Sequence, residues 1–514
     1  MSLEFDEGKP IDEENEPLPF FLRCLLPTVA WVLFAATLPI LFSKGVSFLG
    51  DPAVPRHLAS GRLMWERQEI ITQDPFSYTI PEGRWVRFEW LSEGVAWYLN
   101  ILGGLKLFTV CSMFAFAMIP VLMWRMLIYQ KITAPVAFVY SLITIIILHA
   151  HLLARPFLFT YLFTLIVIHF WALDFERPRK VFQWLLPVLF MLWCNLHAGF
   201  VGGLLFLFIS WIGAAIDRCQ SGERIWTEGA RIWLRTMILC FLATLVNPYG
   251  IGLLVRIFET IFMIKSVGLL EESAGLDFVN ALPLAVGFFI VIITLILNRT
   301  GEKLKWAELL PVLLFLYFGF KTRRHVFILM MFAALPICRI WQRALESWWK
   351  EKTVQKWREF TQMQRELCSD LLWISVTCVV TFALFWVSEM GQKIEIGAES
   401  LPKETRVFIG DHLDRFQRPI HHTGNAGPLM YYFYPKMKVM IDDRIDYYGD
   451  DWTGKYMNLY HLRKGWREQL VQGNYDSAIL DPLDTLVQGL LLLPDWSQVY
   501  QDKTTVIFWR NKKE

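Results

Sequence analysis

Long apolar segments alternate with short polar ones along most of the chain. A helix that crosses a membrane needs about 20 mostly apolar residues, because the hydrocarbon layer is about 30 Å thick. The pattern predicts about eleven such helices, so we expect a polytopic α-helical membrane protein. The predicted spans are roughly 20–42, 105–124, 134–152, 156–173, 182–197, 199–216, 234–253, 281–298, 306–320, 325–341 and 371–389.

The loops between the predicted spans differ in charge. Lysine and arginine concentrate in alternate loops, and loops rich in these residues stay on the cytoplasmic side. This bias places the acidic N-terminal tail, 1–19, in the cytoplasm, the membrane domain at 20–389, and residues 390–514 on the outer side. The first outer loop, 43–104, contains an amphipathic stretch from Glu89 onward, which we expect to lie in the membrane interface.

Short β-rich runs alternate with helix-like stretches after the last span. This alternation predicts a small soluble α/β domain with a βαβ-type sheet. The predicted strands are 406–409, 438–441, 477–480 and 505–509, and the predicted helices are 425–434, 453–472 and 483–493.

Composition supports a membrane protein and excludes several other classes. Hydrophobic residues make up 54% of the chain and charged residues 19%, below the roughly 25% of soluble domains. The net charge is +2 and no extended basic surface is evident, so we expect no nucleic-acid partner. The eight cysteines lie almost all in or beside apolar segments and form no CxxC, which predicts neither a disulfide framework nor a cysteine metal site.

Carboxylates gather in the first outer loop, where Asp51 directly follows the first span and Asp74 and Glu89 come after it. A carboxylate at an apolar boundary can act as a general base or bind a divalent cation. Asp51, Asp74 and Glu89 are therefore candidate catalytic residues, and Asp51 and Asp74 are candidate ligands of Mg²⁺ or Mn²⁺. The alternative is that the two Asp-Pro pairs begin turns and that Glu89 begins a plain interfacial helix.

Candidate phosphate-binding residues occur in the same loop and at the outer ends of later spans. Arg56 and His57 together could bind a phosphate, although a histidine can equally bond the backbone of its own loop. Polar groups at a span end tend to be functional, which singles out Asn195 and His197, unless they form hydrogen bonds between helices. Arg323-Arg324 opposes the charge bias of the loops and needs a counter-ion, such as a lipid phosphate.

A further candidate ligand site lies in the C-terminal domain. Asp442, Asp443 and Arg444 follow a predicted strand, which is where α/β folds place their ligands. The alternative is a surface turn.

These residues also carry a resemblance that covers nearly the whole chain, in order. The chain resembles a mostly uncharacterised family of bacterial polytopic membrane proteins, which is similar in plan to the GT-C glycosyltransferases. In the first loop the chain departs from that pattern at Pro55-Arg56 and at Phe88, which replace two tryptophans and a histidine. The matching segments are Asp51-Pro52, His57-Leu58, Asp74-Pro75-Phe76-Ser77, Glu89-Trp90-Leu91-Ser92-Glu93, Arg155-Pro156, Asn195-Leu196-His197-Ala198-Gly199, Asn247-Pro248-Tyr249-Gly250, Arg323-Arg324 and Ile441-Asp442-Asp443-Arg444.

The resemblance implies a GT-C-like fold and an enzyme of the bacterial inner membrane with a periplasmic C-terminal domain. Such an enzyme moves a sugar from a polyprenyl-phosphate carrier to an acceptor on the outer face. Asp51 then matches the residue that deprotonates the acceptor or binds the metal, and Arg323-Arg324 suits the carrier phosphate. Two alternatives remain open: a non-catalytic scaffold subunit of a membrane complex, and a transporter.

Overall fold

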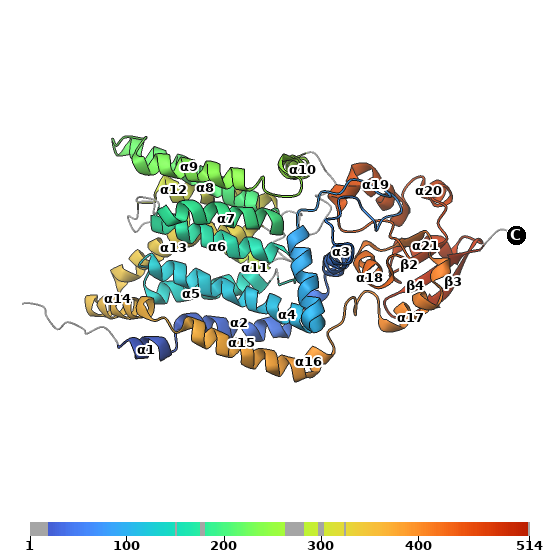
Figure 1. The fold of residues 1–514 in the computed structure, drawn as a ribbon, viewed down its shortest axis with the longest axis horizontal. Coiled ribbons are helices and arrows are strands. Elements are labelled where there is room, and N and C mark those ends of the chain that lie inside the picture. The colour runs from blue at the N-terminus through green and yellow to red at the C-terminus, as the bar shows by residue number, and fades with distance from the viewer. Residues whose placement is uncertain are drawn as a thin grey trace, which may run out of the picture.

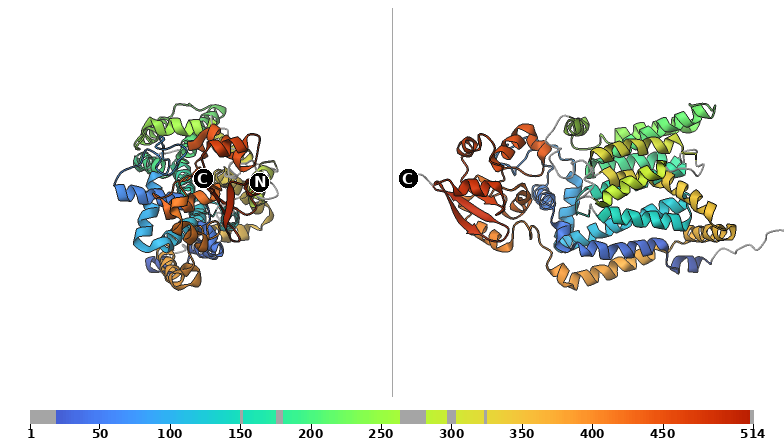
Figure 2. Two further views of the ribbon diagram at one scale, coloured as in Figure 1. Left: turned by 90° about the vertical axis from the view of Figure 1, so that its right-hand side faces the viewer. Right: turned by 180° about the vertical axis from the view of Figure 1, so that it is seen from behind.

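The computed structural model describes residues 19–149, 152–174, 180–262, 282–296, 303–322 and 325–511. Most of this chain is helical, and its longer helices run side by side in a bundle (Figure 1). The C-terminal domain lies beyond one end of the bundle, whereas α1 (Phe20–Leu25) and α14 (Glu351–Glu366) lie at the other end. The view from behind shows the same elongated arrangement (Figure 2).

The bundle consists of apolar helices. Among the described residues, five stretches are long and apolar enough to cross a membrane: Phe20–Ser43, Trp90–Tyr129, Phe200–Gln220, His325–Trp348 and Asp370–Val387. These helices indicate a multi-pass membrane protein. The bundle contains α2 (Val29–Ser43), the second part of α4 (Trp90–Tyr129), α5 (Ala134–Leu148), α6 (Phe157–Asp174), α7 (Lys180–Leu196), α8 (Phe200–Gln220), α9 (Glu228–Ala243), α11 (Leu282–Ile296), α12 (Trp306–Lys321), α13 (His325–Trp348) and α15 (Asp370–Val387).

Helix occupies every predicted span, but the segment 234–253 is not one helix. Helix α9 ends at Ala243, and a separate helix, α10 (Ile251–Phe262), follows it. Asn247 closes the turn between them, because its side-chain amide donates to the Thr244 carbonyl at 2.7 Å and to the Gly250 carbonyl at 3.1 Å. The apolar run at 234–253 therefore contains a turn at which the chain changes direction.

The first loop folds as a helix packed against α4. Helix α3 (Ala53–Arg67) follows the 3₁₀ turn η1 (Gly45–Leu49). Gly61 brings α3 against the backbone of α4, since a Cβ there would lie 2.2 Å from the Glu93 carbonyl oxygen. This close approach brings the side chains of α3 close to the start of α4.

Helix α4 changes direction where the predicted interfacial stretch ends. Its first part lies across the end of the bundle, and its second part runs within the bundle (Figure 1). The bend is at Gly103 and Gly104, whose backbone is not helical; Gly104 has φ +66°, a conformation that favours glycine. Val95, Tyr98 and Leu102 of the first part are exposed, as the amphipathic pattern predicts.

The C-terminal domain is built on one mixed sheet. The strands lie in the order β1-β2-β4-β3; β1 and β2 are parallel and the other pairs are antiparallel. The connection from β1 to β2 contains three helices and forms the predicted βαβ unit. Helix α16 (Glu389–Gln392) lies at the end of α15, beside the bundle. The elements of the domain are α17 (Lys403–Asp411), η5 (Leu413–Arg415), β1 (Pro419–His421), α18 (Thr423–Phe433), α19 (Ile445–Tyr460), α20 (Trp466–Gln472), β2 (Ser477–Leu480), α21 (Thr485–Leu491), β3 (Trp496–Gln501) and β4 (Val506–Arg510).

Two of the four predicted strands in this domain are confirmed, as β2 and β4. The strand predicted at 406–409 is wrong: it lies in α17, where Thr405 and Ile409 are buried one helical turn apart. The run at 438–441 is also not a sheet strand. It forms an isolated bridge with the first loop, in which the Val439 amide donates to the Phe76 carbonyl at 2.9 Å.

Candidate functional site

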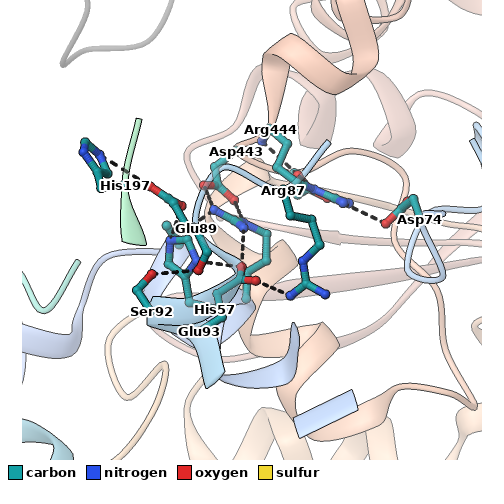
Figure 3. A network of polar contacts seen from close by, with 12 residues as sticks. His57, Asp74, Arg87, Glu89, Ser92, Glu93, His197, Asp443 and Arg444 are labelled. Carbon is teal, nitrogen blue, oxygen red and sulfur yellow. Dashed lines mark hydrogen bonds and ion pairs between the residues drawn. The ribbon is translucent and has the colours of Figure 1, made fainter. Parts of the chain in front are cut away.

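Many of the residues singled out in the sequence meet where the C-terminal domain contacts the end of the bundle. We call this region the junction: it comprises the start of α3, residues 72–93, the N-terminal residues of α8 with the turn before them, and residues 438–446. In one continuous network of polar contacts, His57, Glu89, His197 and Asp443 approach one another (Figure 3). Arg56 joins this network through Asp443 and His57.

Glu89 lies at the centre of this network. Its Oε2 is 3.4 Å from His57 Nε2, and its Oε1 is 3.5 Å from His197 Nε2. Its side chain is 24% exposed. Burial raises the pKa of Glu89, although the nearby His57 and Arg56 oppose that change. A partly accessible carboxylate between two imidazoles can accept a proton and pass it on.

The partners of His57 define its protonation. Its Nδ1 is 3.0 Å from Oε1 of Glu93, which carries no proton to donate when ionised, so we assign the proton to Nδ1. Arg56 Nη2 lies 3.3 Å from His57 Nε2 and can only donate, which agrees with this tautomer. Nε2 also faces the carboxylate of Glu89.

His197 presents the opposite tautomer to Glu89. The Gly199 amide donates to His197 Nδ1 at 3.0 Å, and Thr160 Oγ1 lies 2.7 Å from the same nitrogen. The proton of a neutral His197 is therefore on Nε2, which points toward Glu89. The break between α7 and α8 builds this arrangement, because Gly199 packs directly against Thr160: a Cβ there would lie 2.1 Å from Oγ1.

Glu93 holds other side chains of the network in place. It lies one helical turn after Glu89 and is buried. It receives a hydrogen bond from Arg87 and lies 3.6 Å from Arg56 Nη1. A buried carboxylate with several charge-assisted contacts orients its partners rather than reacting.

The C-terminal domain contributes Asp443 to the same network. Arg56 Nε donates to Asp443 Oδ1 at 2.7 Å and Nη2 donates to Oδ2 at 2.9 Å, in a two-pronged pair. Burial alone would raise the pKa of Asp443, but the Arg56 guanidinium outweighs it and holds that pKa well below its usual range. Two segments far apart in the sequence are thus joined by a partly buried ion pair.

A second cluster beside the first holds the domain in place. Arg444 Nη1 donates to Asp74 Oδ1 at 2.7 Å, and Arg444 Nε donates to Asp442 Oδ1 at 2.8 Å. The guanidinium also stacks on Trp85, 4.1 Å from the ring centroid. The second oxygen of Asp74 accepts from the Ser77 amide at 2.9 Å. Asp74 and Asp442 are completely buried, so this cluster connects the domains and presents no reactive group.

Asp51 is also engaged in the structure. Its Oδ1 accepts from Arg155 Nε at 2.7 Å and from the Ala53 amide at 2.8 Å at the start of α3. The contact with the Ala53 amide agrees with the alternative in which Asp51-Pro52 begins a turn. Among the described residues there is no group of three or more histidine, cysteine or acidic side chains that could hold a metal ion. With Asp51 on Arg155 and Asp74 on Arg444, the divalent cation stays a prediction.

The remaining predicted residues lie outside the network or outside the described chain. Asn195 is fully used: it accepts from Trp90 Nε1 at 2.8 Å and donates to the Met191 and Val246 carbonyls at 2.7 and 2.9 Å. It connects helices, as the alternative reading held. Arg323 and Arg324 lie outside the residues that the structure describes.

Arg87 and Glu93 of the junction, and Arg155, which pairs with Asp51, were not among the predicted site residues. Glu93 carried a usable signal, because it repeats Glu89 at the i+4 spacing of one helix face. Arg155 begins a span on the same side as Asp51 and has the opposite charge. Arg87 offered no local signal, since its partner depends on how the loop folds.

The fold and the site together define the class of this protein: a multi-pass helical membrane protein with an α/β domain held over a polar site at one end of its bundle. Comparison with known proteins finds no match, either to a family model or to a curated protein.

Proposed function

We propose that this protein is a GT-C-like glycosyltransferase of the bacterial inner membrane, with about eleven spans and the junction on the outer face. It transfers a sugar from a polyprenyl-phosphate carrier to an acceptor. The observation that carries the proposal is the Glu89 carboxylate, partly exposed between His57 and His197 at the end of an apolar bundle. The basic alternate loops and the resemblance of the first loop support the orientation and the class.

In this mechanism Glu89 is the general base. An acceptor hydroxyl gives its proton to Glu89 as its oxygen bonds to the anomeric carbon of the sugar. The bond from that carbon to the carrier's phosphate oxygen breaks, and the phosphate leaves with the electron pair. Glu89 takes this role in place of Asp51, whose carboxylate is bonded to Arg155 and to the start of α3.

The carrier phosphate needs cations near the reacting carbon. Arg323 and Arg324 remain the residues that the resemblance assigns to it. The carboxylates of Asp51 and Asp74 do not offer a free donor set for Mg²⁺ or Mn²⁺, because each is paired with an arginine. No step of the mechanism is therefore assigned to a divalent cation.

The test replaces the proposed base. Glu89→Gln keeps the size of the side chain and removes the proton acceptor, so transfer of a labelled sugar from polyprenyl phosphate falls about 100-fold or more. Glu69→Gln is the matched control, since Glu69 is exposed and outside the network. Wild-type protein that neither binds polyprenyl-phosphate lipid by mass spectrometry nor transfers sugar would overturn the proposal.

A second candidate function is a scaffold subunit of a membrane complex. It is favoured by the clusters Arg56–Asp443 and Arg444–Asp74–Asp442, which use most of the junction's charges to hold the C-terminal domain. A stable co-purifying membrane protein, together with absence of bound polyprenyl lipid, distinguishes this function from the transferase.

A further inference from the structure

Helix α10 lies crosswise to the bundle helices, near the junction. In Figure 1 it is viewed nearly down its axis, whereas the bundle helices lie in the plane of the picture, and the view from behind agrees (Figure 2). The sequence pattern did not separate this helix from the preceding span. A short helix in this position must place each of its faces against a different environment.

Two apolar faces of α10 differ sharply in their exposure. Leu253 and Ile257 are buried against the bundle. On another face, Ile251, Val255 and Ile261 are 58%, 51% and 54% exposed. At 100° per residue these three fall within one apolar stripe, about 120° wide. Unlike Leu253, the three side chains of this stripe are only partly covered by the described part of the chain. Water would be a poor environment for them.

The stripe continues an apolar surface that belongs to the membrane domain. Ile238, Leu242 and Val246 of α9 and the turn after it are 51%, 51% and 59% exposed and lead directly to α10. The crosswise first part of α4, at the same end of the bundle, exposes apolar residues as well (Figure 1). This continuity identifies the occupant as lipid rather than a protein partner.

We propose that α10 is an interfacial helix whose stripe of Ile251, Val255 and Ile261 contacts the acyl chains of the leaflet facing the C-terminal domain. Amphipathic helices bind membranes in this way, with the apolar face 5–10 Å below the headgroups, on the order of one side chain. This lipid contact requires no catalytic activity, so it stands or falls independently of the proposed transferase.

The polar face of α10 connects this lipid contact to the C-terminal domain. Arg256 Nη2 lies 3.6 Å from Asp446 Oδ2 and also donates to the Asp446 backbone carbonyl. Asp446 is in the first turn of α19, two residues after Arg444. Arg256 thus adds a contact between the membrane-bound helix and the C-terminal domain, beside the ion pairs of the junction.

Three exposed valines allow a matched test of the lipid contact. Val255 lies on α10, Val379 on the bundle helix α15, and Val407 on the C-terminal domain; they are 51%, 68% and 55% exposed. Each is replaced in turn by the photo-crosslinking residue benzoylphenylalanine, in the full chain in phosphatidylethanolamine–phosphatidylglycerol nanodiscs. After illumination, mass spectrometry should find phospholipid adducts at 255 and 379 and none at 407. Adducts at 379 but not at 255 would overturn the proposal.

A second measurement tests the seating of the domain. In nanodiscs, Val255→Asp places a charge in the lipid and should speed amide hydrogen exchange in the first turn of α19 several-fold. Val407→Asp, at a position of similar exposure, should leave that exchange unchanged. Arg256→Gln should reproduce the effect of Val255→Asp. Unchanged exchange in both α10 variants would show that α10 does not hold the domain.

Discussion

Two carboxylates of the first loop have different neighbours, and the neighbours decide what each can do. Asp51 faces a guanidinium and the start of α3, and its hydrogen bonds to both hold it in place. Glu89 faces two imidazoles and is partly exposed. The sequence predicted both as candidates, and the structure provides a reason to prefer the second.

The raised pKa of Glu89 predicts an acidic limb in the pH profile of transfer. A base must be deprotonated, so activity rises as pH increases through a pKa that lies above the usual value of about 4.3 for glutamate. The initial rate measured from pH 4 to 9 should show this limb. A rate already at its maximum at pH 4.5 would contradict the role of Glu89 as base.

The same shift has a stability consequence of opposite sign. A folded-state pKa above the unfolded value means that the folded protein binds the proton more tightly, so this stabilising contribution fades as pH rises through the folded pKa. At pH 8, Glu89→Gln should therefore unfold at the same temperature as wild type or higher, while transfer is lost. A lower unfolding temperature would indicate a structural role for the carboxylate.

Asp51→Asn should show the opposite combination. Losing one charge of the Arg155 pair weakens the start of α3 by about 1–3 kcal/mol, so the unfolding temperature falls while transfer keeps most of its rate. Thermal unfolding and transfer are measured on the same preparation. Full loss of transfer with unchanged unfolding temperature would return the role of base to Asp51.

Among helices and strands, close packing at one glycine holds the C-terminal domain against the first loop. A Cβ at Gly427 of α18 would lie 1.9 Å from the Pro52 carbonyl oxygen, just before α3. Gly427→Ala should therefore destabilise the protein by about 1–3 kcal/mol. Gly454→Ala is the control, because a Cβ there meets nothing within 4 Å and alanine favours helix. Equal unfolding temperatures for the two variants would contradict this packing.

The sequence predicted helices well where the length of an apolar run is enough to identify them. It predicted them poorly where the chain changes direction within such a run. The apolar runs of α8 and α13 are long enough to be recognised from the sequence as membrane-spanning helices. Helix α10 was missed because its apolar residues extend the run of α9, and only the Asn247 turn separates the two. The run 406–409 is β-rich in composition, but it lies in α17, which buries Thr405 and Ile409 at helical spacing, so tertiary packing outweighed propensity.

In the whole molecule, buried charge pairs join two parts of the chain that are far apart in the sequence. These pairs could not be predicted from the sequence. The Asp442–Arg444 segment and the first loop were each predicted as a site, but their union at Arg56–Asp443 and Arg444–Asp74 requires the fold. Partners this far apart in sequence leave no periodic signal.

Acid should loosen the junction. Asp443 has a folded-state pKa below the unfolded one, so its stabilising contribution is present above the usual aspartate pKa of about 3.9 and is lost as pH falls below it. Protection of the amides at 438–446, relative to their intrinsic exchange rate at each pH, should fall below pH 4. In Asp443→Asn exchange should already be faster at pH 7 and respond less to acid. An equal acid response in the variant would assign the effect to other carboxylates.

The Arg56–Asp443 pair can form only late in the synthesis of the protein. The two residues are 387 positions apart, so the ribosome reaches Asp443 roughly 20 to 80 s after Arg56 at about 5–20 residues per second. Until then the nascent first loop carries a guanidinium without its carboxylate partner in the C-terminal domain. A chain that ends before Asp443 therefore lacks this contact between the first loop and the C-terminal domain.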